Sequence, residues 1–213
     1  MTAAKGVRVL LWRHGRTAYN HAQRWQGQID VPLDDVGRAQ AAAGARSLAK
    51  LVEGVEVTIV ASDLSRAAQT GGTLGALLGV PVATDPRLRE IAAGEWEGLT
   101  RPEIVEAGMA DVLAAWVRGD DVRIGRTGER RSEVGRRGAA AIAEHAAAVP
   151  DGSTLVVASH GGLVRGSTLT LLGLDPAGWN VLGTIGNCHW VDLHLRAGAW
   201  RLNGYNLSAP DAP

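Results

Sequence analysis

Three apolar segments of the chain end in the same way, and this shared pattern sets the class of fold. Residues 7–12, 57–61 and 154–158 are short runs rich in valine, leucine and isoleucine. Each leads into a polar or glycine-containing turn and then into a helical stretch. Repeated strand–turn–helix units predict a parallel sheet with right-handed crossovers on its faces. We therefore expect an α/β protein, a three-layer α/β/α sandwich with a mostly parallel central sheet.

The remaining elements are predicted from the periodicity of apolar residues. Ser62 or Asp63 is expected to cap a helix that carries Arg66 in its first turn. A final strand is expected over residues 189–195. Helices are expected over residues 39–51, 67–78, 102–117, 134–149 and 163–172.

No linker in the sequence is long enough to divide the chain into two parts. Residues 1–207 are therefore expected to form one domain, followed by a disordered tail over residues 208–213. The stretch 118–131 is charged and poor in apolar residues, so we expect a lid-like insertion around residues 100–131. The arginines of residues 118–137 are expected on a solvated surface, and the alternative is that they grip a substrate carboxylate.

Composition limits the partners and the location of the protein. Basic and acidic residues both number 22, so no excess of charge favours nucleic acid or an anionic membrane surface as a partner. Cys188 is the only cysteine and allows no intrachain disulfide. Residues 1–6 lack the pattern of a signal peptide, and no apolar run reaches membrane-spanning length. These features predict a cytoplasmic protein.

The chemically informative side chains follow the predicted strands directly. Because the carboxyl ends of parallel strands meet at one edge of a sheet, Arg13, His14, Arg66 and His160 are expected to converge there. An arginine is costly to bury unless an anion compensates its charge. A histidine beside such an arginine indicates that the anion is a phosphate and that the histidine attacks it.

This set of residues suits phosphoryl transfer without a metal or a cofactor. Neutral imidazole is nucleophilic near neutral pH, and two arginines can neutralise a phosphoryl group through bidentate hydrogen bonds. The leaving oxygen needs a proton, for which Glu90 is the candidate and Glu95 and Glu97 are the competitors. No metal pair is expected, because His189 and His194 would point to opposite faces of the predicted strand.

Six motifs follow one another along most of the chain. They are RHGRTAYN from residue 13, QGQIDVPL from residue 26, SDLSRAAQT from residue 62, LRE from residue 88, GEWEG from residue 94 and SHGG from residue 159. In type and order they resemble the motifs of the histidine phosphatase superfamily, in its phosphoglycerate mutase-like branch.

The resemblance implies a role for each candidate residue. His14 would be the phosphorylated nucleophile and Glu90 the proton donor. The residues around the phosphate would be Arg13, Arg66 and His160, and those that bind the substrate would be Asn20, Gln26, Gly27 and Gly161.

One motif departs from the family pattern. Residues 127–132 read TGERRS where related phosphatases usually have GGES, so Arg130 stands in place of a serine. This change predicts a different shape for that side of the pocket with the same chemistry.

The resemblance favours net hydrolysis of a small phosphorylated metabolite. The segment GEWEGLT over residues 94–100 is of the phosphatase type, and the longer lysine-bearing insertion of the mutases is missing. Residues 26–28, 98–100 and 186–190 are similar to those of phosphatases that act on glucosyl-3-phosphoglycerate. The alternatives are a mutase-type phosphoryl transfer, a broad-specificity phosphatase for another sugar or nucleotide-loop phosphate, and a non-catalytic binding module. A homodimer is also expected.

Overall fold

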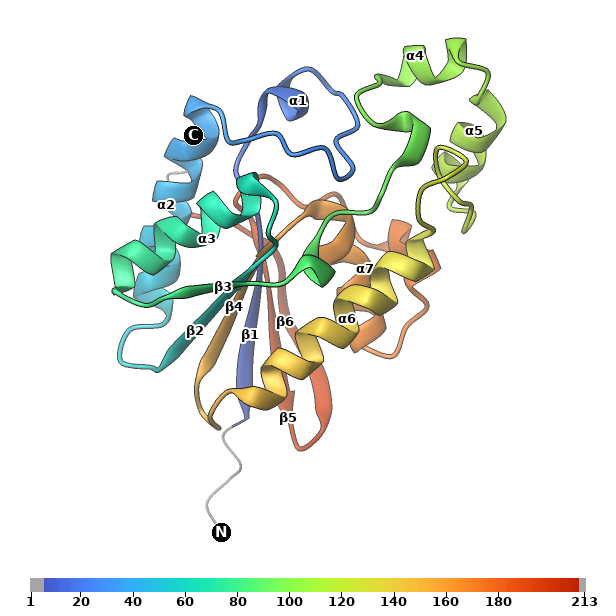
Figure 1. Cartoon of the computed structure of the whole chain (residues 1–213). Coiled ribbons are helices and arrows are strands. Elements are labelled where there is room, and N and C mark those ends of the chain that lie inside the picture. The colour runs from blue at the N-terminus through green and yellow to red at the C-terminus, as the bar shows by residue number, and fades with distance from the viewer. Residues whose placement is uncertain (1–5, 211–213) are drawn as a thin grey trace.

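The central sheet has six strands in the order β3-β2-β4-β1-β5-β6 within residues 6–210, the part of the chain that this computed structural model describes (Figure 1). Strands β1 to β4 are parallel, whereas β5 runs antiparallel to β1, and β6 antiparallel to β5. This arrangement confirms the α/β class and the mostly parallel sheet. The strands are β1 Val7–Arg13, β2 Val57–Ala61, β3 Val82–Thr84, β4 Thr154–Ser159, β5 Trp190–Arg196 and β6 Ala199–Leu207.

The sequence does not predict two of these strands. β3 has only three residues, too few to show a period, and β6 is an edge strand without a fully buried side chain. The predicted strand over residues 189–195 corresponds to β5, which is not the last strand. His189 precedes β5, so its position relative to His194 does not follow strand alternation.

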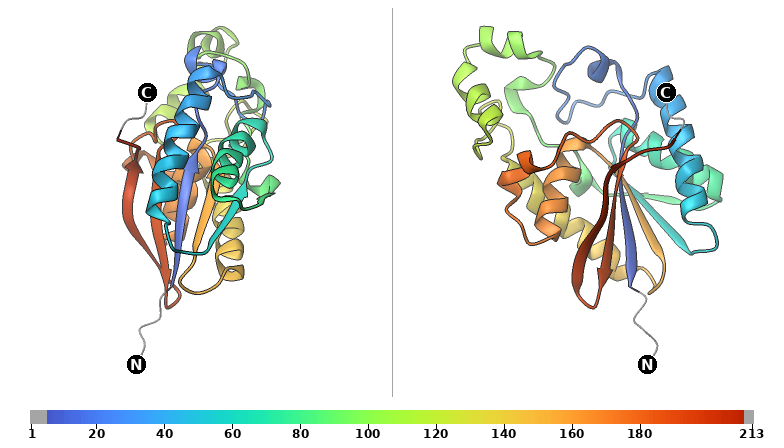
Figure 2. Two further views of the ribbon diagram at one scale, coloured as in Figure 1. Left: turned by 90° about the vertical axis from the view of Figure 1, so that its left-hand side faces the viewer. Right: turned by 180° about the vertical axis from the view of Figure 1, so that it is seen from behind.

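Helices cover both faces of the sheet (Figures 1 and 2). α2 (Asp35–Leu51) and α3 (Ser65–Leu78) cover one face, and α6 (Arg131–Ala148) and α7 (Gly161–Leu171) cover the other. Successive side chains of β1 enter the two cores in turn: Leu10 and Trp12 pack with α2 and α3, whereas Val9 and Leu11 pack with α6 and α7. Each such burial stabilises the fold by about 1.5–3 kcal/mol.

The short helices gather at the carboxyl ends of the parallel strands (Figures 1 and 2). Edge-to-face contacts between indole rings stabilise this end of the molecule. The ring centroid of Trp25 lies 4.9 Å from that of Trp96 and 5.8 Å from that of Trp116. The predicted insertion around residues 100–131 lies here. The elements are α1 Ala18–His21, α4 Arg101–Glu106 and α5 Ala110–Arg118, with 3-10 helices η1 Pro86–Leu88, η2 Gly94–Trp96 and η3 Pro176–Val181.

All of the predicted helices differ by some residues from the observed bounds, and two of them differ most. α2 begins at Asp35, earlier than expected, because the carboxylate of Asp34 accepts a hydrogen bond of 2.7 Å from the amide of Gly37 and caps the first turn. The helix predicted over residues 102–117 is two helices, α4 and α5. Gly108 lies between them with φ +74°, a left-handed conformation that ends α4.

The prediction that Ser62 or Asp63 caps α3 is wrong. Leu64 holds the cap position without a side-chain hydrogen bond, and the only α3 backbone amide that reaches the Ser62 hydroxyl is that of Leu64 itself, at 3.3 Å, among the described residues. Arg66 lies in the first turn as expected, because α3 begins at Ser65. The capping prediction failed because the side chain of Ser62 is needed elsewhere, as the site shows.

The carboxyl-terminal segment follows β6. Ala209 is only 7% exposed, so the start of the predicted tail packs against the rest of the protein. The end of that tail, residues 211–213, lies outside the described residues. Among the described residues, no helix is both long and apolar enough to cross a bilayer.

Candidate active site

His14 lies immediately after β1, where hydrogen bonds fix its backbone on both sides. Its amide donates to the carbonyl of Ser159 at 2.9 Å, and its carbonyl accepts a bond of 3.0 Å from the side-chain amide of Asn187. The next residue must be a glycine, because a Cβ atom on Gly15 would lie 2.3 Å from the carbonyl oxygen of Gly37. The turn therefore has one backbone path, and this path places the His14 ring at the sheet edge.

The His14 ring is held in one tautomer and in its neutral form. Nδ1 lies 2.7 Å from the carbonyl oxygen of Gly15. A carbonyl only accepts, so Nδ1 carries the proton and Nε2 keeps its lone pair. Burial, and then the charges of Arg66 and Arg13, hold the pKa of His14 well below its ordinary value. Nε2 is therefore an unprotonated nitrogen at the edge of a cationic pocket.

Arg13 and Arg66 bring positive charge to His14 from two sides. Arg13 donates from Nη1 to the carbonyl of Ile185 at 2.6 Å, while its buried Nε has no hydrogen-bond partner among the described residues. Arg66 is fully buried and donates to the carbonyls of Gly27 and Ile29, each at 2.8 Å. These carbonyls fix the Arg66 guanidinium and leave further N–H groups for an anion.

His160 lies beside His14 but does not line the open pocket. The two ring centroids are 5.2 Å apart with an interplanar angle of 62°. Both ring nitrogens of His160 are occupied, Nδ1 by Arg66 Nε at 3.2 Å and Nε2 by Ser62 Oγ at 2.9 Å. His160 thus lies near His14, where the sequence analysis expected it. That analysis did not single out its bond to Ser62, which lies 98 residues away along the chain.

The side-chain amides of Asn20 and Gln26 both point their NH₂ groups away from Thr17. Thr17 Oγ1 donates to Gln26 Oε1 at 2.9 Å, and the Thr17 amide donates to Asn20 Oδ1 at 3.2 Å, so both amide oxygens are engaged. No hydrogen bond within residues 6–210 uses the NH₂ group of either amide. Thr17, fully buried, is a positioning residue that the sequence motif contained but that the sequence reasoning did not single out.

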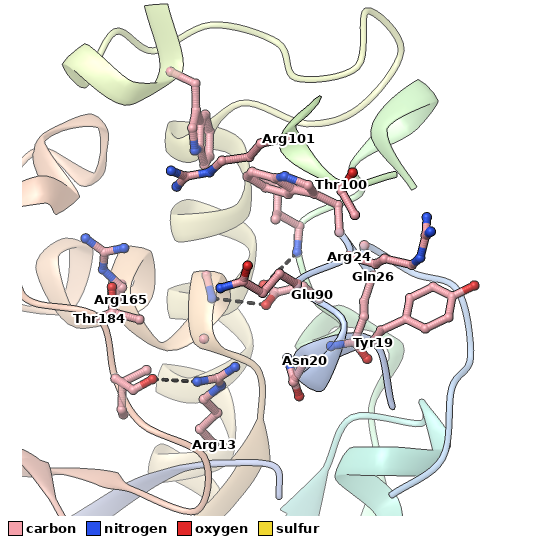
Figure 3. Close-up of a pocket in the computed structure, with 18 of the residues that line it drawn as sticks. Arg13, Tyr19, Asn20, Arg24, Gln26, Glu90, Thr100, Arg101, Arg165 and Thr184 are labelled. Carbon is pink, nitrogen blue, oxygen red and sulfur yellow. Dashed lines mark hydrogen bonds between the residues drawn. The ribbon is translucent and has the colours of Figure 1, made fainter. Parts of the chain in front are cut away.

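Glu90 faces the pocket and caps α7 from outside the helix. Its two carboxylate oxygens accept hydrogen bonds from the amides of Gly162 and Leu163, both at 3.1 Å, and Oε1 also accepts from Ile91 at 2.9 Å (Figure 3). These bonds fix the carboxylate at the first turn of α7. Gly162 is small enough for this approach, since a Cβ atom there would lie 2.6 Å from Glu90 Oε1.

The competing carboxylates do not reach the pocket. Glu95 pairs with Arg126 at 2.9 Å on the exposed side of the molecule. Glu97 accepts from the amides of Gln28 and Ala93 at 2.8 and 3.1 Å. Glu90 is the acidic residue among the described residues that line the cavity.

The cavity has a volume of about 920 Å³ and a strongly cationic lining. Gly27 and Gly161, both expected to bind substrate, lie on its wall beside Arg13 and Asn20. Three tryptophans in the lining, Trp25, Trp116 and Trp179, form a continuous aromatic wall. The arginines in the lining are Arg13, Arg24, Arg66, Arg101, Arg131 and Arg165.

Residues 118–137 are only in part the solvated surface that the sequence predicted. Arg118, Arg123 and Arg126 are exposed and pair with Asp120, Glu133 and Glu95 at 2.5–2.9 Å. Arg131 is different, because it is 1% exposed and lies in the cavity wall.

Arg130, which departs from the expected family pattern, holds the cap position of α6, where its amide donates to the Glu133 carboxylate at 2.9 Å. The altered motif therefore retains the helix start.

The remaining polar groups do not form a metal centre. No cluster of three or more His, Cys, Asp or Glu side chains within residues 6–210 is arranged to hold a metal ion. Burial raises the pKa of the Cys188 thiol to about 12, so it stays protonated near neutral pH.

The fold and the site together define an α/β protein with a neutral buried histidine in an arginine-lined anion pocket. The chain belongs to the histidine phosphatase superfamily (branch 1), whose family model matches residues 9–208. It is 42% identical to the glucosyl-3-phosphoglycerate phosphatase of Mycolicibacterium vanbaalenii over 95% of both chains. It is 34% identical to a probable phosphoglycerate mutase of Yersinia enterocolitica, over 95% of this chain and 92% of that one.

A solved structure of a related protein has the same fold. A mycobacterial glucosyl-3-phosphoglycerate phosphatase in complex with VO3 superposes with a TM-score of 0.86 at 39% identity, over 94% of this chain and 99% of that chain.

Proposed function

We propose that the protein is a phosphatase that hydrolyses glucosyl-3-phosphoglycerate through a phosphohistidine on His14. The observation that carries the mechanism is the neutral His14, with Nε2 unprotonated beside the guanidinium groups of Arg13 and Arg66. The substrate is proposed from the relatives, since glucosyl-3-phosphoglycerate phosphatases share 38–42% identity with this chain over 95% of its length.

In the first step, His14 Nε2 attacks phosphorus in line with the ester oxygen. The N–P bond forms as the P–O bond to the leaving group breaks, and protonated Glu90 gives its proton to the departing oxygen. Arg13 and Arg66 stabilise the charge on the equatorial oxygens, and the NH₂ groups of Asn20 and Gln26 add hydrogen bonds. The first product leaves with a protonated hydroxyl group in place of the phosphate ester.

In the second step, water attacks the phosphohistidine. Glu90, now a carboxylate, accepts a proton from this water as the new P–O bond forms and the N–P bond breaks. Inorganic phosphate leaves, His14 returns to its neutral form and Glu90 is again protonated. His160, engaged by Arg66 and Ser62, holds the Arg66 guanidinium and the His14 ring in place during both steps.

A phosphate-release screen of phosphorylated metabolites, including glucosyl-3-phosphoglycerate and 3-phosphoglycerate, tests the substrate. The highest kcat/KM is expected for glucosyl-3-phosphoglycerate, with activity retained in EDTA. The variant His14→Ala should release no phosphate, and acid-labile, base-stable phosphoprotein should be trapped from the wild type alone. Activity of His14→Ala, or loss of activity in EDTA, contradicts the mechanism.

The 34% identity to a probable phosphoglycerate mutase makes phosphoryl transfer between hydroxyl groups the second candidate. A mutase would isomerise phosphoglycerates after priming with a bisphosphate and would release little phosphate. The same screen, followed by phosphorus NMR of the products, separates the two functions, and net phosphate release is expected.

Three features remain predictions of the sequence: a cytoplasmic location, a homodimer and closure of the segment around residues 100–131 over the substrate. Light scattering coupled to size-exclusion chromatography tests the dimer. Slower hydrogen exchange of residues 100–131 with bound vanadate tests the closure.

A further inference from the structure

The cavity contains a second group of arginines beyond the one around His14. Arg131, the first residue of α6, and Arg165, in α7, both stack on Trp179, with each Cζ atom 5.1 Å from the centroid of its ring. Arg131 also lies over Trp116, with Cζ at 3.9 Å. Two cations from adjacent helices are therefore held in fixed positions against aromatic rings.

Neither arginine has a carboxylate partner within hydrogen-bond or ion-pair distance among the described residues. Arg131 donates from Nη2 to the carbonyl of Trp116 at 2.5 Å, and its Nε and Nη1 are buried without a partner. Arg165 donates from Nη2 to the carbonyls of Trp179 and Leu182, both at 2.8 Å, and its Nε is also unpartnered. Backbone carbonyls orient both guanidinium groups without neutralising either.

The pair is electrostatically unfavourable as it stands. Burial, and next the charge of Arg165, lower the pKa of Arg131 to about 10, with Asp121 and Asp120 acting in the opposite direction. Burial lowers the pKa of Arg165 as well, and Tyr205 and Glu90 oppose this. Buried like charges destabilise a protein unless an anion lies between them. By contrast, the exposed arginines of the same segment already have acidic partners.

The geometry of α7 relates this pair to the phosphate site. Gly161 and Arg165 are four residues apart, so they lie on the same face of α7, about 6 Å apart along its axis. Gly161 lies against Arg13, since a Cβ atom there would be 3.4 Å from Arg13 Nε. Figure 3 shows Arg165 and Arg13 along one wall of the cavity, with Glu90 beside them. Arg13 and Arg165 therefore both line this cavity near α7, where they can bind two anionic groups of one small molecule.

We propose that Arg165 and Arg131 form a second anion subsite that binds the carboxylate of a phosphorylated hydroxy acid. This subsite rests on the proposed function, because it assumes that His14 receives the phosphate of the same molecule. Both guanidinium groups lie against the Trp179 indole, and the carboxylate supplies the counter-charge for their unpartnered N–H groups. A phosphomonoester with a carboxylate is then the preferred substrate class.

Two substrates that differ only at this group test the subsite. 3-Phosphoglycerate carries the carboxylate, and glycerol 3-phosphate has a hydroxymethyl group in its place. The wild type should have a kcat/KM at least about tenfold higher for 3-phosphoglycerate, mostly through KM. Arg165→Gln and Arg131→Gln should each lose about tenfold on 3-phosphoglycerate and change little on glycerol 3-phosphate or p-nitrophenyl phosphate. Arg126→Gln, which removes the same charge outside the cavity, should leave all three unchanged.

The outcomes separate the subsite from the proposed function. If both variants lose activity equally on all three substrates, the two arginines are only structural. If the wild type does not prefer the substrate with the carboxylate, the subsite proposal is wrong and the proposed phosphatase function is unaffected. If no substrate is hydrolysed, the proposed function fails. The affinities of the wild-type protein for 3-phosphoglycerate and glycerol 3-phosphate, measured by calorimetry, then test the subsite. Arg165→Gln is the comparison variant if Arg131→Gln does not fold. Equal affinities of the wild type for the two ligands contradict the carboxylate subsite.

Discussion

Arg66 donates a hydrogen bond from Nε to Nδ1 of His160 over 3.2 Å, and neither side chain is exposed to solvent. A guanidinium can only donate, so Nδ1 accepts and the ring proton of His160 lies on Nε2. That N–H donates to the Ser62 hydroxyl at 2.9 Å. A serine and an arginine from the β2–α3 turn thereby fix the ring that packs beside His14.

Ser62→Ala should therefore weaken both the fold and the activity. The variant leaves the Nε2–H group of His160 buried without an acceptor, which costs about 1–3 kcal/mol in the free energy of unfolding. The loss of orientation should lower kcat more than it raises KM. Urea unfolding and steady-state kinetics measure the two effects. Ser65→Ala is the control, because the buried Oγ of Ser65 has no hydrogen-bond partner among the described residues. Equal behaviour of the two variants would show that Ser62 does not hold His160.

The buried histidines predict how stability depends on pH. Burial first, and then the charge of Arg66, hold the pKa of His14 and of His160 well below the ordinary value of 6.5. As the pH falls below that value, the unfolded chain takes up protons that the native state does not bind. The free energy of unfolding should then fall by up to about 1.4 kcal/mol per pH unit for each histidine, until the lower native pKa is reached. Above 6.5 this contribution is fully present.

Urea unfolding of the wild type and of His14→Asn at a series of pH values measures this dependence. The variant should lose about half of the slope between mildly acidic and neutral pH, since His160 remains. An unchanged slope would mean that His14 has the same pKa in both states.

Glu90→Gln should slow the enzyme according to the leaving group. Alkyl phosphates need a proton on the departing oxygen, so their kcat should fall by about 10²–10⁴-fold. p-Nitrophenolate leaves without that proton, so p-nitrophenyl phosphate should be affected much less. Glu95→Gln, which lies outside the cavity, is the matched control. Equal slowing of both kinds of substrate would exclude Glu90 as the acid and leave it a cap of α7.

The sequence predicted the parts of the site that topology decides. Arg13 ends β1, and His14 and Arg66 lie in or after the turns that follow β1 and β2. The carboxyl ends of strands in one parallel sheet converge whatever the connecting segments do. The roles of single polar groups depend on contacts across the fold, which periodicity does not encode. Ser62 was predicted as a helix cap, but its hydroxyl is the acceptor for His160.

Arg131 shows a second limit of sequence reasoning. The charged stretch around Arg131 predicted a solvated surface, and the nearby Arg123 and Arg126 are exposed as this predicts. Its own burial follows from two indoles, Trp116 and Trp179, that come from α5 and η3 and meet only in the folded protein. Edge strand β6 was missed for a related reason, since a strand with few buried side chains shows no apolar alternation.

Asp85 should make the fold sensitive to acid. Burial acts to raise the pKa of its carboxyl group, but hydrogen bonds from Arg87 and His145 outweigh it and hold the pKa at about 2. The folded pKa is thus below the unfolded value of 3.8, and stability is present above 3.8 and lost as the pH falls toward 2. The loss amounts to roughly 2 kcal/mol.

Asp85→Asn should be less stable than the wild type at neutral pH by a similar amount, and the difference should shrink between pH 4 and pH 2, roughly the interval between the two pKa values. Thermal unfolding of both proteins across this pH range measures the difference in stability. Asp35→Asn is the control, because Asp35 is 97% exposed and its pair with Arg38 contributes little. A constant difference between wild type and Asp85→Asn at every pH would show that the loss comes from packing around β3 and α6, and that the charge of Asp85 has no part in it.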